Sequence, residues 1–127
     1  MLLLYIAVGG AIGALARYGL GGWVHTWGGT RMPWGTFVVN VIGSLLIGLA
    51  LRFLEGVPST PEVRALVSIG LLGAFTTFST YTYETVALMR TGEWARAGVY
   101  SLGSLVIGIL AVMVGLGVAG MILRARG

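Results

Sequence analysis

The sequence predicts an all-α membrane protein with four transmembrane helices, and its length and composition carry that prediction. Hydrophobic residues make up 57% of the 127 residues, whereas charged residues make up only 9%. A soluble domain carries about 25% charged residues, so this chain is too apolar to face water on all sides. A soluble enzyme, a nucleic-acid-binding protein and a disordered chain are therefore excluded. A helix needs about 20 apolar residues to span a membrane, so one domain of this length has room for four spans.

Four apolar stretches follow one another along the chain, and we expect the spans roughly at residues 2–22, 34–54, 62–90 and 95–123. In the first span, Gly9 and Gly13 form a small-xxx-small pair, which allows a neighbouring helix to approach closely. A turn-rich segment is expected at residues 23–33, and Pro33 is placed to start the second helix. A loop with two prolines and a short polar connection separate the remaining spans.

The third span is unusual because a short apolar run is followed by the most polar segment of the chain. The run, residues 65–75, covers about half of a ~30 Å bilayer core at ~1.5 Å per residue. The polar segment, residues 76–85, then begins at mid-membrane depth. We expect a helix broken near Gly73 to Thr77, where freed carbonyl groups can bind a cation. The alternative is an unbroken helix whose hydroxyls bond to its own carbonyls.

Polar side chains fall on one face of several spans. At helical spacing they are Thr36, Asn40 and Ser44 in the second span and Tyr100 and Ser104 in the fourth. In the third span the aromatic residues Phe78 and Tyr81 are i, i+3 neighbours. Hydrogen bonding between helices explains most single hydroxyls. A buried amide such as Asn40 is costly when unpaired, so we expect it to have a functional partner or to face a water-filled path.

Two charged residues lie well inside the spans, Arg17 and Glu84. An intramembrane charge is a functional candidate by default, but Arg17 can also extend to the interface and Glu84 can lie near a hydrated helix end. The chain lacks the relay of titratable groups that a proton pump needs. It also lacks a nucleophile paired with a base, so we do not expect an enzyme.

The arginines are balanced between the two sides of the membrane. With four spans both termini lie on one side, together with Arg52, Arg64, Arg124 and Arg126; the other side holds Arg31, Arg90 and Arg96, with Arg17 nearby. The positive-inside rule therefore has almost no bias on which to act. We expect insertion in both orientations and an antiparallel, dual-topology homodimer with a two-fold axis in the membrane plane.

Three motifs resemble those of the CrcB/Fluc fluoride channels. The stretch Gly73-Ala-Phe-Thr-Thr-Phe-Ser-Thr-Tyr81 is similar to the GGFTTFSTF-type signature of that family. Residues 34–44 resemble its GTxxxNxxGS motif, and residues 9–18 resemble its first-span pattern. The motifs occur in the family's order and spacing, and the likeness covers essentially the whole chain.

The resemblance implies a passive, fluoride-selective channel that lets the anion leave the cell through the plasma membrane and so lowers its toxicity. It also implies a homodimer with a structural sodium ion at its centre, held by the backbone carbonyls of Gly73 and Thr76. Arg17 and Glu84 match vestibule or gating charges. The fluoride path is implied at Thr36, Asn40, Phe78, Tyr81, Tyr100 and Ser104.

This chain departs from the family pattern at two positions. Tyr81 stands where the family has a second phenylalanine, so that either its hydroxyl or its ring edges can meet the anion. Gly108 stands where relatives can have a third hydroxyl of the polar track, so donors are expected to be fewer there.

Three other functions compete with a fluoride channel. A small proton-coupled exporter of drug-like cations shares the size and the four spans but needs a membrane-embedded acid, for which Glu84 is the candidate. A membrane subunit without transport of its own does not explain the Thr-Thr-Phe-Ser-Thr run. An intramembrane hydrolase is the weakest alternative, because His25 is the only imidazole in the chain and is expected in a loop.

Overall fold

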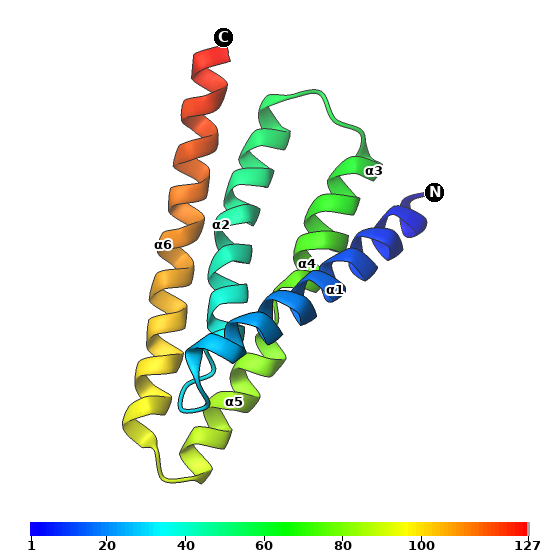
Figure 1. Ribbon diagram of the computed structural model, residues 1–127. Helices are drawn as coiled ribbons and strands as arrows, with labels where there is room; N and C mark the ends of the chain where they lie inside the picture. Colours follow the sequence, from blue (N-terminus) through cyan, green and yellow to red (C-terminus); the bar gives the residue numbers. More distant parts are fainter. Residues whose placement is uncertain (127) are drawn as a thin grey trace.

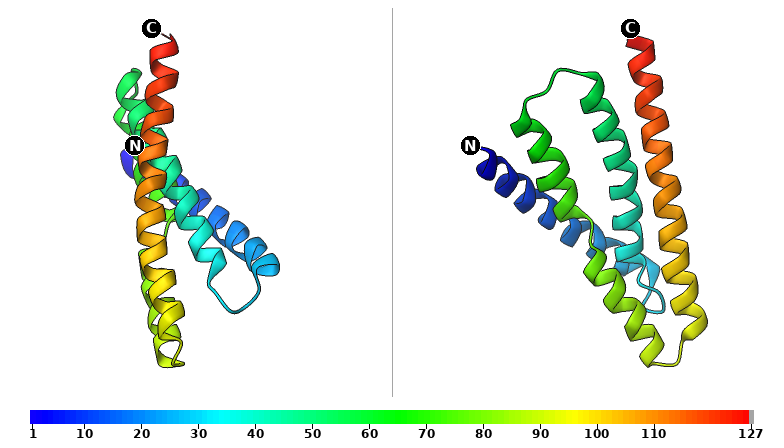
Figure 2. Two further views of the ribbon diagram at one scale, coloured as in Figure 1. Left: turned by 90° about the vertical axis from the view of Figure 1, so that its left-hand side faces the viewer. Right: turned by 180° about the vertical axis from the view of Figure 1, so that it is seen from behind.

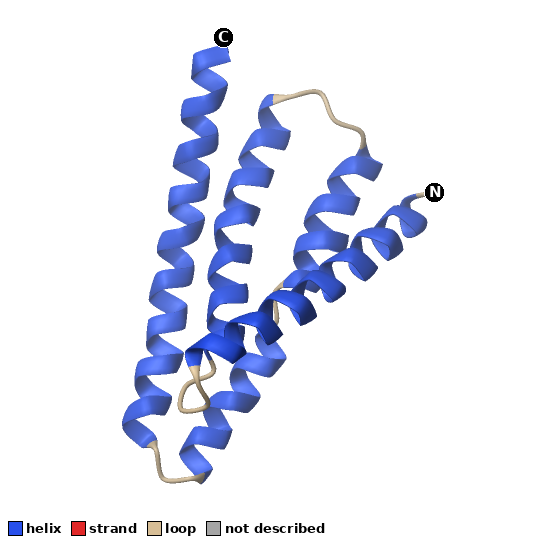
Figure 3. Cartoon of the chain, viewed as in Figure 1, coloured by secondary structure: helices blue, strands red, loops and turns tan. Residues whose placement is uncertain are grey.

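The computed structural model describes residues 1–126, which form helices joined by short loops, with no strand in that range (Figures 1 and 3). In chain order the elements are α1 (Leu2–Gly28), α2 (Trp34–Gly56), α3 (Pro61–Arg64), η1 (Ala65–Leu72), α4 (Gly73–Phe75), α5 (Phe78–Arg90) and α6 (Trp94–Arg126). Four stretches are long and apolar enough to cross a membrane, namely Leu2–Gly28, Trp34–Gly56, Pro61–Arg90 and Trp94–Arg126. The prediction of four helical stretches that are long and apolar enough to span a membrane is therefore confirmed.

Helix α1 is longer than predicted, because the segment expected to be turn-rich from residue 23 stays helical as far as Gly28. This stretch contains no proline, and the Thr26 hydroxyl bonds back to the Trp23 carbonyl (2.6 Å). The helix ends where Gly29 adopts a positive φ of 72°, a conformation that glycine reaches without steric cost. The sequence predicted His25 in a loop, and this prediction is wrong, because His25 lies on the last turn of α1.

The third span is broken at its middle, as predicted. Thr76 (ψ 156°) and Thr77 (φ −145°, ψ 112°) are extended and separate α4 from α5. We call these two residues the break, which Figure 3 shows as a loop within the span. Thr77 is the N-cap of α5, because its hydroxyl accepts a hydrogen bond from the Thr80 N–H (3.3 Å).

Helix α1 crosses the first half of the third span obliquely (Figure 2). The two backbones approach closely at the predicted small-residue pair. A Cβ at Gly9 would overlap the Leu66 carbonyl oxygen, and one at Gly13 would overlap the Leu71 carbonyl oxygen. The segment on the other side of this contact, η1, is a π-helix, which the sequence pattern did not predict. Short π-helical turns often occur at functional sites.

Helices α2 and α6 run side by side in both views of Figure 2 and carry most of the small core. Val39, Ala97, Tyr100 and Ala119 are almost fully buried. Elsewhere the chain encloses little interior, since only 11–22% of the most apolar part of each span is buried. Both termini lie at the end of the molecule that holds the α2–α3 connection (Figure 1).

Candidate functional site

The candidate site lies around the break, where the side chain of Asn40 on α2 pairs with the backbone of Thr77. The Asn40 Nδ2 donates to the Thr77 carbonyl (3.0 Å), and its Oδ1 accepts from the Thr77 N–H (2.8 Å). One amide thus pairs both backbone groups of a residue that has left the helix. A second Nδ2 hydrogen remains for another acceptor. Asn40 is therefore paired with backbone groups of Thr77, and its functional role stays a prediction.

Two carbonyl groups at the break have lost their helical donors. In an α-helix the Gly73 carbonyl accepts from the N–H of Thr77, and the Thr76 carbonyl accepts from that of Thr80. Here the Thr77 N–H donates to Asn40 and the Thr80 N–H donates to the Thr77 hydroxyl. These are the two carbonyls implied as cation ligands.

Glu84 on α5 brings together two residues of the predicted path. It accepts hydrogen bonds from the Thr36 hydroxyl on α2 (2.8 Å) and from the Tyr100 hydroxyl on α6 (2.7 Å). The sequence predicted all three residues but not their contact. The carboxylate is half-buried and lies among neutral donors, and residues 1–126 provide no ion pair to it.

Three aromatic rings form a row from the break toward α6. Phe78 and Tyr81, expected to be neighbours, have ring centroids 5.7 Å apart, and Tyr81 and Tyr100 are 5.5 Å apart. The Tyr81 hydroxyl donates to the Ser101 carbonyl on α6 (2.8 Å). Ser101 was not predicted, because a backbone acceptor leaves no signal in the sequence.

A cavity of about 580 Å³ lies beside this row of rings, and we call it the Asn40 cavity. Its polar and aromatic lining includes Asn40, Ser44, Phe78, Tyr81, Thr82 and Ser104. The Ser104 Oγ is buried and has no hydrogen-bond partner within residues 1–126. A buried hydroxyl without a partner is costly, and no group within residues 1–126 satisfies this one.

Gly108 also lines the Asn40 cavity. A Cβ at this position would lie 3.5 Å from the Ser44 hydroxyl. On α6 the polar residues Tyr100 and Ser104 are followed at the same spacing by Gly108, which has no hydroxyl. Ser44 on α2 therefore places a hydroxyl next to Gly108.

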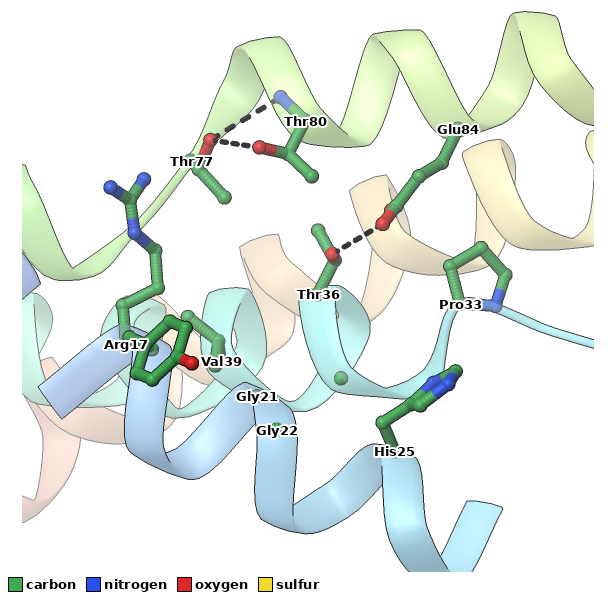
Figure 4. Close-up of a pocket in the computed structure, with 12 residues that line it drawn as sticks. Arg17, Gly21, Gly22, His25, Pro33, Thr36, Val39, Thr77, Thr80 and Glu84 are labelled. Atoms are coloured by element: carbon green, nitrogen blue, oxygen red, sulfur yellow. Dashed lines mark hydrogen bonds between the residues drawn. The ribbon is translucent and has the colours of Figure 1, made fainter. Parts of the chain in front are cut away.

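A second cavity, of about 410 Å³, opens between α1, α2 and α5, and we call it the Arg17 cavity (Figure 4). Arg17 and Glu84 both line it, together with Thr36, Thr77 and Thr80. In Figure 4 the Arg17 guanidinium lies on the side of Thr77, while Glu84 approaches from farther along α5. Arg17 therefore lines a cavity beside the break, and its role as a vestibule charge stays a prediction.

Several hydroxyls of the polar run are satisfied by carbonyls three or four residues earlier in the chain. Those of Thr76, Thr82 and Thr85 bond to the carbonyls of Leu72, of Phe78 and Ser79, and of Tyr81, respectively. This is the back-bonding that the alternative of an unbroken helix assumed, yet it coexists with the break. The break depends on Thr77, which is bonded to Asn40 and Thr80 instead.

The comparisons with known proteins agree with the motifs. The sequence profile of the family "CrcB-like protein, Camphor Resistance (CrcB)" matches residues 4–116. A protein of Thermus thermophilus named "Fluoride-specific ion channel FluC" is 50% identical over 113 residues, which are 88% of each chain. Proteins of the same name from Acidobacterium capsulatum and Chloroflexus aurantiacus are each 47% identical, over 91% of this chain and over 94% and 92% of their own lengths. The chain therefore belongs to the CrcB family.

Proposed function

We propose that this protein is a fluoride-selective channel that allows passive export of fluoride through the cell membrane and lowers its toxicity. Its relatives named as fluoride-specific channels are similar along nearly the whole chain. The observation that carries the proposal is the lining of the Asn40 cavity, which combines an amide, hydroxyls and aromatic rings without a charged side chain.

This lining matches the chemistry of fluoride. The ion is small and strongly hydrated, so leaving water is costly unless other donors replace its shell. Asn40 has a spare amide hydrogen, and the Ser104 hydroxyl is unpartnered within residues 1–126. The positive edge of an aromatic ring, such as that of Phe78, also attracts an anion. Neutral donors allow the ion to leave again, which conduction requires.

The acid in this path is suited to a channel rather than to a proton-coupled exporter. Glu84 is the only acidic residue well inside a span, and both of its carboxylate oxygens accept hydrogen bonds. A proton relay needs several titratable groups in sequence. The cavity linings add one imidazole, that of His25 on the last turn of α1, and no second carboxylate, which is fewer groups than such a series requires.

The working unit that we propose is an antiparallel homodimer of two oppositely inserted copies. The polar residues Ser79 and Thr80 are exposed next to the break, and Phe78 is 77% exposed. Hydroxyls and irregular backbone at mid-membrane are unfavourable against lipid and are tolerated when protein covers them. A second copy that packs on this surface covers them and supplies the missing wall of the path.

The same interface suits a structural sodium ion. The carbonyls of Gly73 and Thr76 have lost their helical N–H donors, and unwound backbone carbonyls are typical ligands of Na⁺ in membrane proteins. Two copies related by a two-fold axis would present four such oxygens. Within residues 1–126 no cluster of three or more His, Asp or Glu could hold a metal, which leaves backbone carbonyls as the ligands that the proposed site would use. When bound, the ion supplies positive charge that lowers the electrostatic cost of an anion nearby.

Fluoride efflux from liposomes that contain the purified protein tests the proposed function, with chloride as the comparison. With valinomycin present so that potassium can follow, we expect rapid fluoride release and chloride release at the rate of protein-free vesicles. Equal rates for the two anions, or no release of either, would refute fluoride selectivity. Repeating the assay on protein purified without sodium tests the cation site separately, since its loss should slow fluoride release.

A further inference from the structure

The hydroxyl of Tyr81 is committed to the protein rather than to the cavity that its ring lines. A phenol has one O–H donor, and that of Tyr81 donates to the Ser101 carbonyl at 2.8 Å. The remaining lone pairs of the phenolic oxygen repel an anion. Tyr81 therefore offers fluoride its ring, not its hydroxyl.

A second phenol makes the reciprocal bond. Tyr100 on α6 donates to Glu84 on α5 (2.7 Å), whereas Tyr81 on α5 donates to Ser101 on α6. The two rings lie 5.5 Å apart at an interplanar angle of 48°. Helix α5 is thus tied to α6 at two levels, with the tyrosine rings packed between the two hydrogen bonds.

This pair of bonds fixes the segment that follows the break. Helix α5 begins directly after the extended residues, and its first aromatic residue, Phe78, is 77% exposed and rests against the Tyr81 ring. Tyr81 is therefore held by its hydrogen bond to Ser101 and by its contact with the Tyr100 ring. If the Tyr81 ring could rotate or shift, the Phe78 ring that rests on it would move as well.

We propose that the Tyr81 hydroxyl is a positioning group. Its hydrogen bond fixes the orientation of the Tyr81 ring, and the Tyr81 ring fixes that of Phe78, so that the edges of both rings face the Asn40 cavity. The hydroxyl itself is not a ligand of the anion. This inference rests on the proposed function and gives a role to the residue that replaces the phenylalanine of the family pattern.

The test compares Tyr81→Phe with Tyr83→Phe in fluoride efflux at several fluoride concentrations. Tyr83 is the matched control, since it lies on the same helix and is 73% exposed. We expect Tyr81→Phe to lower the maximal efflux rate about two- to tenfold, the factor that corresponds to one net hydrogen bond. The half-saturating fluoride concentration should stay unchanged, as should both quantities in Tyr83→Phe.

Each other outcome overturns the proposal. A raised half-saturating concentration at an unchanged maximal rate would make the hydroxyl a fluoride ligand. An unchanged efflux curve, with or without a lower unfolding temperature, would make it a purely structural group. If wild-type protein and Tyr83→Phe release no fluoride, the proposed function itself fails.

A spectroscopic measurement on the wild-type protein does not depend on how the variant folds. In protein labelled with ¹³Cζ-tyrosine, the Tyr81 resonance is the one that is missing from the spectrum of Tyr81→Phe. We expect this resonance to stay in place during a fluoride titration, because its O–H remains on the Ser101 carbonyl. A shift that saturates with fluoride would show direct ligation and contradict the proposal.

Discussion

At the scale of single residues, Asn40 is the side chain on which the site depends most. Its carboxamide satisfies both the N–H and the C=O of Thr77. An aspartate at this position keeps an acceptor for the N–H but faces the Thr77 carbonyl with a second negative oxygen, and it adds a charge that repels fluoride. We expect Asn40→Asp to slow fluoride efflux at least about tenfold, equivalent to ~1.4 kcal/mol.

This change should leave the protein folded, so size-exclusion elution and helical circular dichroism serve as controls. The variant Thr91→Ala is a matched control for efflux, because the Thr91 hydroxyl bonds only to carbonyls of its own helix end. Efflux from Asn40→Asp at the wild-type rate would contradict the donor role of Asn40.

Glu84 and its two donors should behave as one energetic unit. A glutamine has a single acceptor oxygen, so Glu84→Gln leaves either Thr36 or Tyr100 without its present partner. We expect a destabilisation of about 1–3 kcal/mol. Tyr100→Phe removes one donor, so the double variant should lose less than the sum of the single variants, with a coupling of ~1 kcal/mol. Unfolding in detergent measures this, and strictly additive losses would show that the contact carries no energy.

At the scale of helices, the closest approach is that of α1 to η1. A Cβ at Gly13 would overlap the backbone of Leu71, whereas one at Gly10 would have no atom within 4 Å. We expect Gly13→Ala to destabilise the protein by about 1–3 kcal/mol through overpacking. Gly10→Ala should be neutral or stabilising, because alanine favours a helix more than glycine does.

These two variants are compared by their unfolding temperatures in detergent. Because both replace glycine by alanine on the same helix, the effect of alanine on helix propensity cancels in the difference between the two temperatures. Equal unfolding temperatures for Gly13→Ala and Gly10→Ala would contradict the close packing of α1 on η1.

The elements show what a sequence pattern can and cannot predict. The break was predictable because an apolar run too short for the bilayer meets a hydroxyl-rich segment. The π-helix was not, because the apolar run at residues 65–72 has the same pattern as a buried stretch of α-helix. The length of α1 was underestimated because Trp and Gly at 23–28 suggested an interfacial turn, whereas the positive φ at Gly29 ends the helix.

Within the site, residue types were predicted more reliably than their partners. Asn40, Thr36, Tyr100 and Glu84 were all expected to matter, and the structure brings them into hydrogen bonds. Their pairing depends on how helices far apart in the chain are rotated against one another. The Tyr81 bond to Ser101 shows the same limit, because any helical carbonyl is an equally good acceptor from sequence alone.

At the scale of the whole molecule, the balanced arginines predict insertion in both orientations. The chain contains no cysteine, so single cysteines at Thr30 and at Ala125 report on opposite ends of the bundle. We expect a membrane-impermeant thiol reagent to modify about half of the molecules of either variant in intact cells. Modification of only one of the two variants would show a single orientation and exclude the antiparallel dimer.

If the path around the break conducts fluoride passively, fluoride release must depend on whether a counter-ion can also cross the membrane. Vesicles loaded with potassium fluoride at neutral pH release fluoride only when potassium can follow, so the rate is measured with a fluoride electrode before and after valinomycin is added. We predict that valinomycin starts rapid release, that a protonophore added afterwards does not accelerate it, and that Asn40→Asp abolishes most of it. Release that requires a proton gradient, or that ignores valinomycin, would contradict a passive fluoride channel.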